Sequence, residues 1–302
     1  MKAIPVSQVA PGHPDHALLS AIAGDITARA GGRAALADKL AAMLRACIDD
    51  VIMTAKTGRR SYDELEKTEK TYIGTRVEIE LRALLGLKRG RLDTEILGHD
   101  VDIKHTMGAN WMIPTEAVDQ PCIVVAADEV QARCYMGLIV ARADHLTAGQ
   151  NKDAKRSVSA HGFAQILWLV ERHPYPPNFW RTVDPDTVAR IFAGDTGNAR
   201  MAQLFREIQR RPIARDVVEA VARQRDFMRR IRSDKGRGTR DILAREGVLL
   251  LSGQYDAALI AELGLRTCGP SEFIACRPAS AAQIDLAARH GLALGGKGSP
   301  AG

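Results

Sequence analysis

The feature that most constrains this chain is a pair of short predicted strands joined by a glycine–histidine turn, within residues 91–104. The stretch reads RLDTEILGHDVDIK. Side chains of a strand point alternately to its two faces, so Asp102 and Lys104 should share one face while Ile103 points to the buried side. The turn should bring Asp93 close to this shared face. The pattern therefore predicts two acids and a lysine gathered beside one strand.

Two carboxylates with a lysine are the groups needed to hold a divalent metal ion beside a phosphodiester. Carboxylate oxygens bind the hard cation, which polarises the phosphate and lowers the pKa of a bound water. The lysine can stabilise the developing charge or orient the attacking water. In a chain with 26% charged residues the pattern also arises by chance, and alone it also fits a solvated hairpin with an ion pair.

Five motifs follow one another along the chain. They are KTEKT-x-x-GT-x-VEI from residue 67, D-x8-D-x-K from residue 93, W-M-x-P from residue 111, N-x-D-x-KR from residue 151 and DFMRRIR from residue 226. In this order they resemble the NaeI family of type II restriction endonucleases. The resemblance covers roughly residues 40–277.

This resemblance implies a catalytic set. Asp93 and Asp102 are expected to bind the metal, and Lys104 is expected to serve the attacking water. Glu78, on the preceding helix, is expected to be an accessory acid. Glu80 is its nearest alternative, but it should project to a different face of the helix. The ion implied is Mg²⁺, held by Asp93, Asp102 and the backbone carbonyl of Ile103.

The first part of the chain should form an α/β core. Helices are predicted from Asp15 to about Thr54, divided at Gly31-Gly32, and from residue 67 to about Leu85. The resemblance implies the same class, a PD-(D/E)xK core with helices around a mixed sheet. Strands are predicted at 91–97, 100–106, 122–127 and 133–140, followed by a helix near 160–170.

A chain of 302 residues should form two domains, and three prolines within residues 171–178 predict a stiff linker between them. The expected organisation is a catalytic domain at 1–170, the linker at 171–178, a second domain at 179–294 and a disordered tail at 295–302. In the second domain, helices followed by a small hairpin fit a winged helix-turn-helix, and the resemblance implies one similar to the catabolite activator protein. Its elements are expected as helices near 184–193, 198–210, 213–232, 239–245 and 255–263, with strands at 248–252 and 272–276.

Basic residues concentrate in this second domain. Residues 205–245 contain 13 Lys or Arg against 6 Asp or Glu, a net charge of +7 beside +6 for the whole chain. Such a stripe is typical of phosphate binding, while the alternative is a solvated helix face. We expect DNA contacts from Arg225, Arg229, Arg230, Arg232, Lys235, Arg237 and Arg240.

Other features bear on compartment and metal binding. The first 15 residues lack the regions of a signal peptide, and no apolar run approaches the roughly 20 residues that span a bilayer, so a cytoplasmic protein is expected. The five cysteines are dispersed, which argues against a disulfide framework and a structural zinc site. The eight histidines form no pair at metal-ligand spacing.

These observations together predict Mg²⁺-dependent, sequence-specific cleavage of double-stranded DNA. The resemblance further implies a type IIE enzyme whose second domain binds another copy of the site, and a cognate DNA methyltransferase. Two cuts in a symmetric duplex call for a twofold homodimer. Two alternatives remain: a strand-nicking endonuclease of the mismatch-repair type, and a non-catalytic winged-helix regulator.

Overall fold

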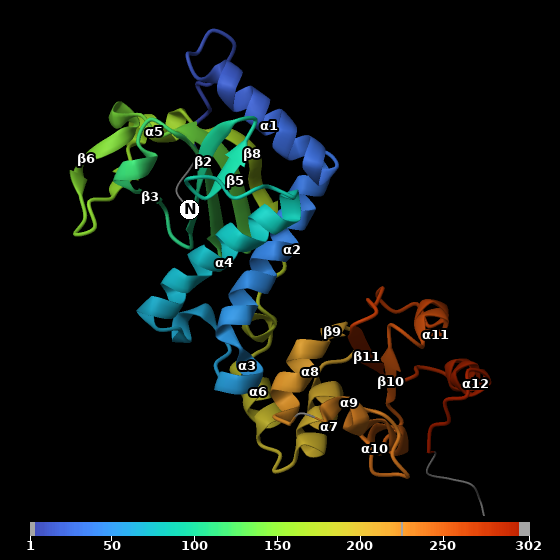
Figure 1. The fold of residues 1–302 in the computed structure, drawn as a ribbon. Coiled ribbons are helices and arrows are strands. Elements are labelled where there is room, and N and C mark those ends of the chain that lie inside the picture. Colours follow the sequence, from blue (N-terminus) through green and yellow to red (C-terminus); the bar gives the residue numbers. More distant parts are fainter. Residues whose placement is uncertain (1–3, 225, 296–302) are drawn as a thin grey trace, which may run out of the picture. The chain divides into compact units, whose positions relative to one another are not determined.

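The computed structural model describes residues 4–224 and 226–295 (Figure 1). The chain forms two compact units. The first unit contains the residues up to Ile52 together with Ser61–Asn178, and the second contains Met53–Arg60 together with the residues from Phe179 onward. The chain therefore contributes a short stretch to the second unit before it completes the first.

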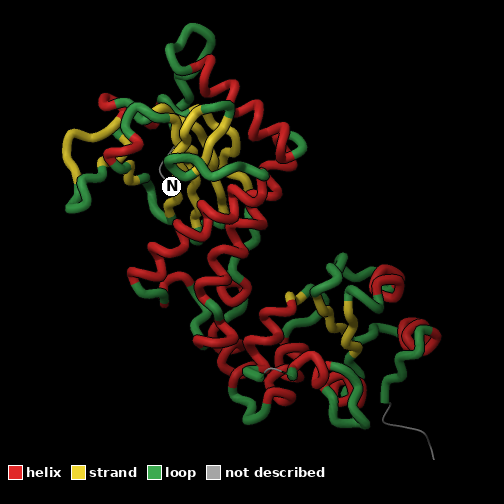
Figure 2. The backbone as a smooth tube through the Cα atoms, viewed as in Figure 1, coloured by secondary structure: helices red, strands yellow, loops and turns green. Residues whose placement is uncertain are grey.

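A five-stranded sheet forms the centre of the first unit (Figure 2). Its order is β1-β2-β4-β5-β8, with β2 and β4 parallel and the other neighbours antiparallel. The expected mixed sheet of an α/β fold is thus confirmed. The strands are β1 (Thr94–Ile96), β2 (His99–Thr106), β4 (Pro121–Asp128), β5 (Arg133–Val140) and β8 (Leu167–Pro174).

One face of this sheet is covered by helices. Val101 and Ile103 of β2 are fully buried in a cluster with apolar residues of α1, α2 and α4. On α4, residues Ile73, Val77 and Leu81 recur every four positions, which turns one stripe of the helix toward the sheet. The elements on this side are α1 (His16–Ala30), α2 (Arg33–Ile52), the short η1 (Tyr62–Glu64) and α4 (Lys67–Leu85).

The opposite face carries a smaller sheet of order β3-β7-β6 and a short helix. Trp111 is buried in this second core, and its ring N–H donates to the carbonyl oxygen of Val125 at 2.7 Å. The W-M-x-P motif therefore has a packing role. The elements are β3 (Met112–Ile113), η2 (Thr115–Ala117), η3 (Ala143–His145), β6 (Leu146–Gln150), β7 (Arg156–Val158) and α5 (Ala160–Ala164).

The expected linker at 171–178 is wrong in its first half. The predicted helix near 160–170 ends early, and the edge strand β8 continues through residue 174, where Pro174 pairs with Arg133. Tyr175 is 2% exposed and packs in the core of the first unit. A proline is tolerated at the end of an edge strand because its missing N–H does not interrupt an interior ladder.

The second unit combines helices with a three-stranded antiparallel sheet of order β10-β11-β9. Leu250 and Ala275 point into a core with α6, α7 and α8, while Leu251 and Ile274 pack on the other side with α11. Most expected elements are present with small shifts at their ends, whereas α3, η4, β9 and α12 were not expected. The elements of this unit are α3 (Thr54–Thr57), η4 (Phe179–Thr182), α6 (Pro185–Phe192), α7 (Gly197–Glu207), β9 (Ile213–Ala214), α8 (Arg215–Ala222), α9 (Phe227–Ile231), α10 (Thr239–Arg245), β10 (Leu249–Ser252), α11 (Ala257–Glu262), β11 (Glu272–Cys276) and α12 (Ala281–Arg289).

The long helix expected at 213–232 is wrong. Ile213 begins strand β9, and α8 ends where Arg223 adopts a left-handed conformation with φ 53°. A second short helix, α9, follows. Val221 and Ile231, which a single helix over 213–232 would carry together, are both buried but come from two helices. Of the tail expected to be disordered, Gly295 donates its N–H to Ala244 at 3.0 Å and residues 296–302 lie outside the described part.

Candidate active site

The β1–β2 hairpin positions the two aspartates. Its turn is formed by Leu97 and Gly98, which both have positive φ (51° and 80°), as a type I′ hairpin turn requires. This turn begins one residue earlier than the sequence suggests. The register pairs Thr94 with Val101, so the next position along the ladder places Asp93 opposite Asp102.

The loop before β1 is held in place by its own contacts. The Asp100 carboxylate accepts the backbone N–H of Arg91 at 2.7 Å and of Leu92 at 3.4 Å. These bonds, that of Arg91 foremost, hold the pKa of Asp100 below its ordinary value. A Cβ on Gly90 would lie 2.6 Å from the carbonyl oxygen of Thr94, so only glycine permits this close approach. The backbone of Asp93 is thereby fixed next to β2.

Lys104 joins the two carboxylates. Its ammonium lies 2.8 Å from Oδ1 of Asp102, 3.3 Å from Oδ2 of Asp93 and 3.1 Å from the carbonyl oxygen of Ile103. Oδ2 of Asp93 also accepts the backbone N–H of Ile103 at 2.8 Å. The shared face of Asp102 and Lys104 expected from strand alternation is confirmed.

Glu78 reaches the same cluster from α4. Burial raises its pKa to about 7, with further contributions from the charges of Asp93 and Asp102 and an opposing one from Lys104. The charges that act on Glu78 thus include those of Asp93, Asp102 and Lys104. Its alternative, Glu80, instead pairs with Arg76 at 3.1 Å, on another side of the helix.

Asp102 is the most buried of the acids, with 3% of the residue exposed. Burial raises its pKa to about 6 against the influence of Lys104, and Asp93 adds to the rise. For Lys104, burial alone would lower the pKa, but the surrounding carboxylates outweigh it and the pKa lies above its ordinary value. Oδ2 of Asp102 is buried without a hydrogen-bond partner among the described residues.

The charges of this cluster do not balance when all three acids are ionised, since three carboxylates face the ammonium of Lys104 and the guanidinium of Arg82, which donates to the carbonyl oxygen of Asp93 at 3.1 Å. A divalent cation would supply the missing positive charge, and oxygen atoms are the ligands that Mg²⁺ prefers. The donors that fit it are the unpartnered Oδ2 of Asp102, the carboxylate of Asp93 and the carbonyl of Ile103. The residue types and the orphaned buried oxygen thus fit a metal bound at this point.

A second group of side chains that could hold a metal ion was not expected from the sequence. His145 and His161 lie close together with Asp144, although no histidine pair was expected at metal-ligand spacing. The two histidines are separated by β6 and β7, so their proximity depends on how this small sheet folds back. Sequence spacing holds no signal of it.

The basic residues of the second unit divide between two places. A cavity of about 720 Å³ is lined by Arg229, Arg230 and Arg237, together with Arg200 and Arg223, which were not expected in the DNA-binding set. Asp195, Asp226 and Asp234 line it too, and Asp226 pairs with Arg230 at 2.9 Å. The α7 N-terminus adds partial positive charge at the same cavity through Gly197 and Asn198.

The other expected DNA-binding residues lie elsewhere. Arg232 and Arg240 line a separate cavity of about 560 Å³, and Arg240 pairs with Asp256 at 3.0 Å. Lys235 is exposed in the loop before α10, and Arg225 lies outside the described residues. The basic stripe expected from the sequence is therefore divided between two cavities, with Lys235 outside both.

Comparison with known proteins gives two matches. A family model described as restriction endonuclease NaeI matches residues 35–288. The chain is also similar to the type II restriction enzyme NaeI of Lentzea aerocolonigenes, with 34% identity over 258 residues, covering 82% of this chain and 80% of the relative. The matched range includes both the carboxylate cluster and the arginine-lined cavity.

Proposed function

The chain belongs to the NaeI family of restriction endonucleases, and we propose that its Mg²⁺-dependent cleavage centre is the carboxylate cluster of β1, β2 and α4. As a type II site-specific deoxyribonuclease it cleaves double-stranded DNA at a defined sequence. The observation that carries the proposal is the buried Oδ2 of Asp102, which lacks a partner within a cluster that has an excess of negative charge.

The residues of the cluster have separable roles in this proposal. Asp93, Asp102 and the carbonyl of Ile103 would hold Mg²⁺, which when bound would supply polarisation of the scissile phosphate and a water of lowered pKa. Lys104 stays protonated because its pKa is raised, so it acts as a fixed positive charge beside the phosphate and orients the attacking water. Glu78, with a pKa of about 7, is partly ionised near neutral pH and can accept a proton.

Digestion of a sequenced plasmid tests this function. With Mg²⁺ the protein should give linear DNA with ends at one sequence, and with EDTA it should give none. Asp102→Asn should lose at least about a hundredfold in cleavage rate while still binding the site in Ca²⁺, because removing the carboxylate removes a metal ligand but no base contact. Nicked product alone would indicate the nicking alternative, and undiminished cutting by the variant would contradict the assignment.

The arginine-lined cavity of the second unit supports a second role. Five arginines against three aspartates, with a helix N-terminus, leave this cavity a net positive charge that suits a phosphate backbone. We infer that this unit, as a winged-helix domain, binds another copy of the recognition site, as in a type IIE enzyme. Two symmetric cuts further favour a homodimer, and a cognate methyltransferase would protect the host sites.

A further inference from the structure

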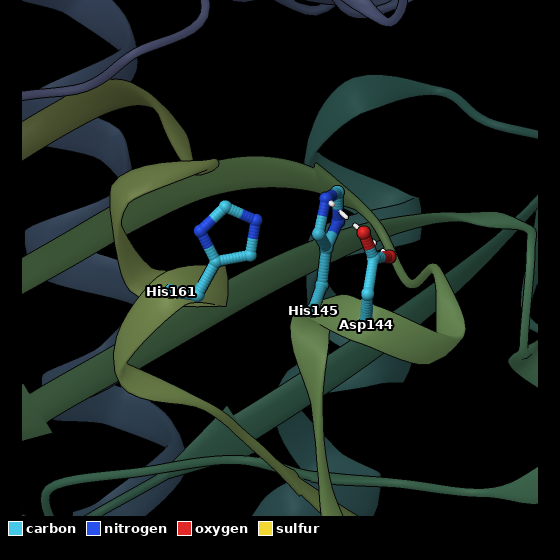
Figure 3. Close-up of side chains that lie close together, drawn as sticks. All are labelled: Asp144, His145 and His161. Atoms are coloured by element: carbon cyan, nitrogen blue, oxygen red, sulfur yellow. Dashed lines mark ion pairs between the residues drawn. The ribbon is translucent and has the colours of Figure 1, made fainter.

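The group of Asp144, His145 and His161 lies in the small sheet and short helix of the first unit (Figure 3). Asp144 and His145 come from η3, and His161 comes from α5. One ligand atom of each residue lies within 4.8 Å of the others, and Nε2 of His145 is 3.9 Å from Oδ1 of Asp144. Figure 3 shows the carboxylate and the two imidazoles projecting side by side from these two segments.

His145 is oriented as metal-binding histidines are. Its ring is buried, with 4% of the residue exposed, and Nδ1 lies 2.8 Å from the carbonyl oxygen of Val140. A carbonyl oxygen only accepts hydrogen bonds, so Nδ1 carries the proton and Nε2 of the neutral ring carries the lone pair. Such a bond to a backbone carbonyl fixes the tautomer and the ring of a metal ligand.

The two segments that supply the ligands are held against each other by the backbone. The carbonyl oxygen of His145 accepts the N–H of Ser159 at 2.8 Å, next to the start of α5. A Cβ on Gly162 would lie 2.1 Å from that same oxygen, so this approach requires glycine. Arg156 also donates to the carbonyl of Ala143 at 2.9 Å. The ligands are therefore brought together by a rigid frame.

We propose that Asp144, His145 and His161 bind one Zn²⁺ ion, with water in the fourth position. Two imidazole nitrogens and one carboxylate oxygen suit zinc, whereas Mg²⁺ prefers oxygen ligands. At Zn–ligand distances of about 2.0–2.2 Å, ligand atoms of a tetrahedral site lie roughly 3.3 Å apart, so the three must close slightly. Asp144 and His161 are both exposed and can rotate toward the buried His145.

The bound ion would join η3 to α5 and so close the loop that β6 and β7 form between them. This site is distinct from the carboxylate cluster of β1, β2 and α4, which offers oxygen ligands and a lysine. The two sites should therefore take different ions from a mixture of Mg²⁺ and Zn²⁺.

Cobalt(II) provides a direct test, since it replaces zinc and absorbs visible light when bound by imidazole in a low-coordinate site. The full-length protein, freed of metal by chelation, is titrated with Co²⁺ in excess Mg²⁺, which keeps the carboxylate cluster occupied. We expect one Co²⁺ per chain with a visible band that stoichiometric Zn²⁺ removes. His161→Gln and Asp144→Asn should each weaken Co²⁺ binding by about tenfold to a hundredfold or more, since even the loss of an outer-shell partner has an effect of that size.

Two controls make the result decisive. His173→Gln alters a half-buried histidine that pairs with Asp38 at 3.1 Å outside the group, and it should leave the titration unchanged. Asp102→Asn should also leave it unchanged. Absence of the band in the unaltered protein, its persistence in both His161→Gln and Asp144→Asn, or its loss in Asp102→Asn would overturn the proposal. Both test residues are exposed, so the substitutions should leave the fold intact, and circular dichroism can verify this.

Discussion

At Glu78 and Asp102, burial opposes ionisation. Both folded-state pKa values, about 7 and about 6, lie above those of free carboxyl groups. The folded protein therefore binds more protons than the unfolded chain between about pH 4 and pH 7, and these two groups make its stability fall as pH rises through that window. A cluster arranged in this way is less stable without a cation than with one, which is the behaviour expected of a metal-binding centre.

Glu78→Gln should accordingly stabilise the metal-free protein at pH 8, by on the order of 1–3 kcal/mol, because it removes a charge that is unfavourable when folded. The gain should shrink as the pH falls through that window and disappear only below about pH 4, where the carboxyl is protonated in both the folded and the unfolded state, and it should also shrink when Mg²⁺ is added. Urea unfolding at several pH values measures it. Glu80→Gln, on the same helix but paired with Arg76, is the matched control. A gain independent of pH would contradict the proposed cause.

At the scale of elements, the β1–β2 hairpin fixes the site only if the preceding loop can pack against it. Gly90→Ala would put a methyl group 2.6 Å from the carbonyl oxygen of Thr94 and displace the backbone toward Asp93. We expect a loss of about 1–3 kcal/mol in the free energy of unfolding and a larger relative loss of cleavage rate. Gly149→Ala, where the added Cβ meets nothing within 4 Å, should change neither. Full cleavage activity of the Gly90→Ala variant would contradict the prediction and show that the loop accommodates the methyl group without displacing Asp93.

The segment from α7 to α10 forms the arginine-lined cavity, and it allows a second element-scale prediction. Arg229→Ala and Arg237→Ala should each weaken DNA binding and reduce the slope of log affinity against log salt by about one unit. Each substitution removes one phosphate contact, so fewer counterions are released when the protein binds DNA. Arg289→Ala, an exposed arginine of α12 away from this cavity, serves as control. Slopes that stay unchanged after both substitutions would favour a solvated cluster.

For the whole molecule, the division into two units has a consequence for coupling. Residues 53–60 belong to the second unit, where Ala55 packs against its main hydrophobic cluster. Cutting the chain between residues 171 and 178 would therefore damage the edge strand β8 and leave Ala55 without its neighbours. Point variants test communication between the units better than truncation does.

If the second unit binds an effector copy of the site, a plasmid with one site should be cut slowly, and a short duplex containing the site should accelerate it. A tenfold acceleration requires about 1.4 kcal/mol of preferential binding to the cleavage-competent state, which is within the usual range of coupling energies. Combining Arg229→Ala with Arg237→Ala should abolish the response to the duplex. Equal cleavage rates on one-site and two-site plasmids, with no response to the added duplex, would contradict the effector role and leave the second unit with DNA binding alone.

Short-range rules let the sequence alone specify a substantial part of this protein. Alternation along a strand placed Asp102 and Lys104 on one face, and the strand predicted at 122–127 is present as the buried β4. The order of five motifs indicated the family, which the comparisons confirm. These features depend on residues close in the chain, where the backbone geometry of a strand or helix fixes what neighbouring side chains can do.

Tertiary structure alone decided the rest, because it depends on packing between distant segments. Burial between α4 and β2 sets the raised pKa of Glu78, and no spacing rule contains that environment. The left-handed backbone at Arg223 ends α8 where helical periodicity would continue it. The fold of β6 and β7 brings His145 to His161 across a stretch that no local pattern connects. Local propensities are weak compared with the free energy of burying apolar surface, so the packing of the whole chain determined where these elements end and which side chains meet.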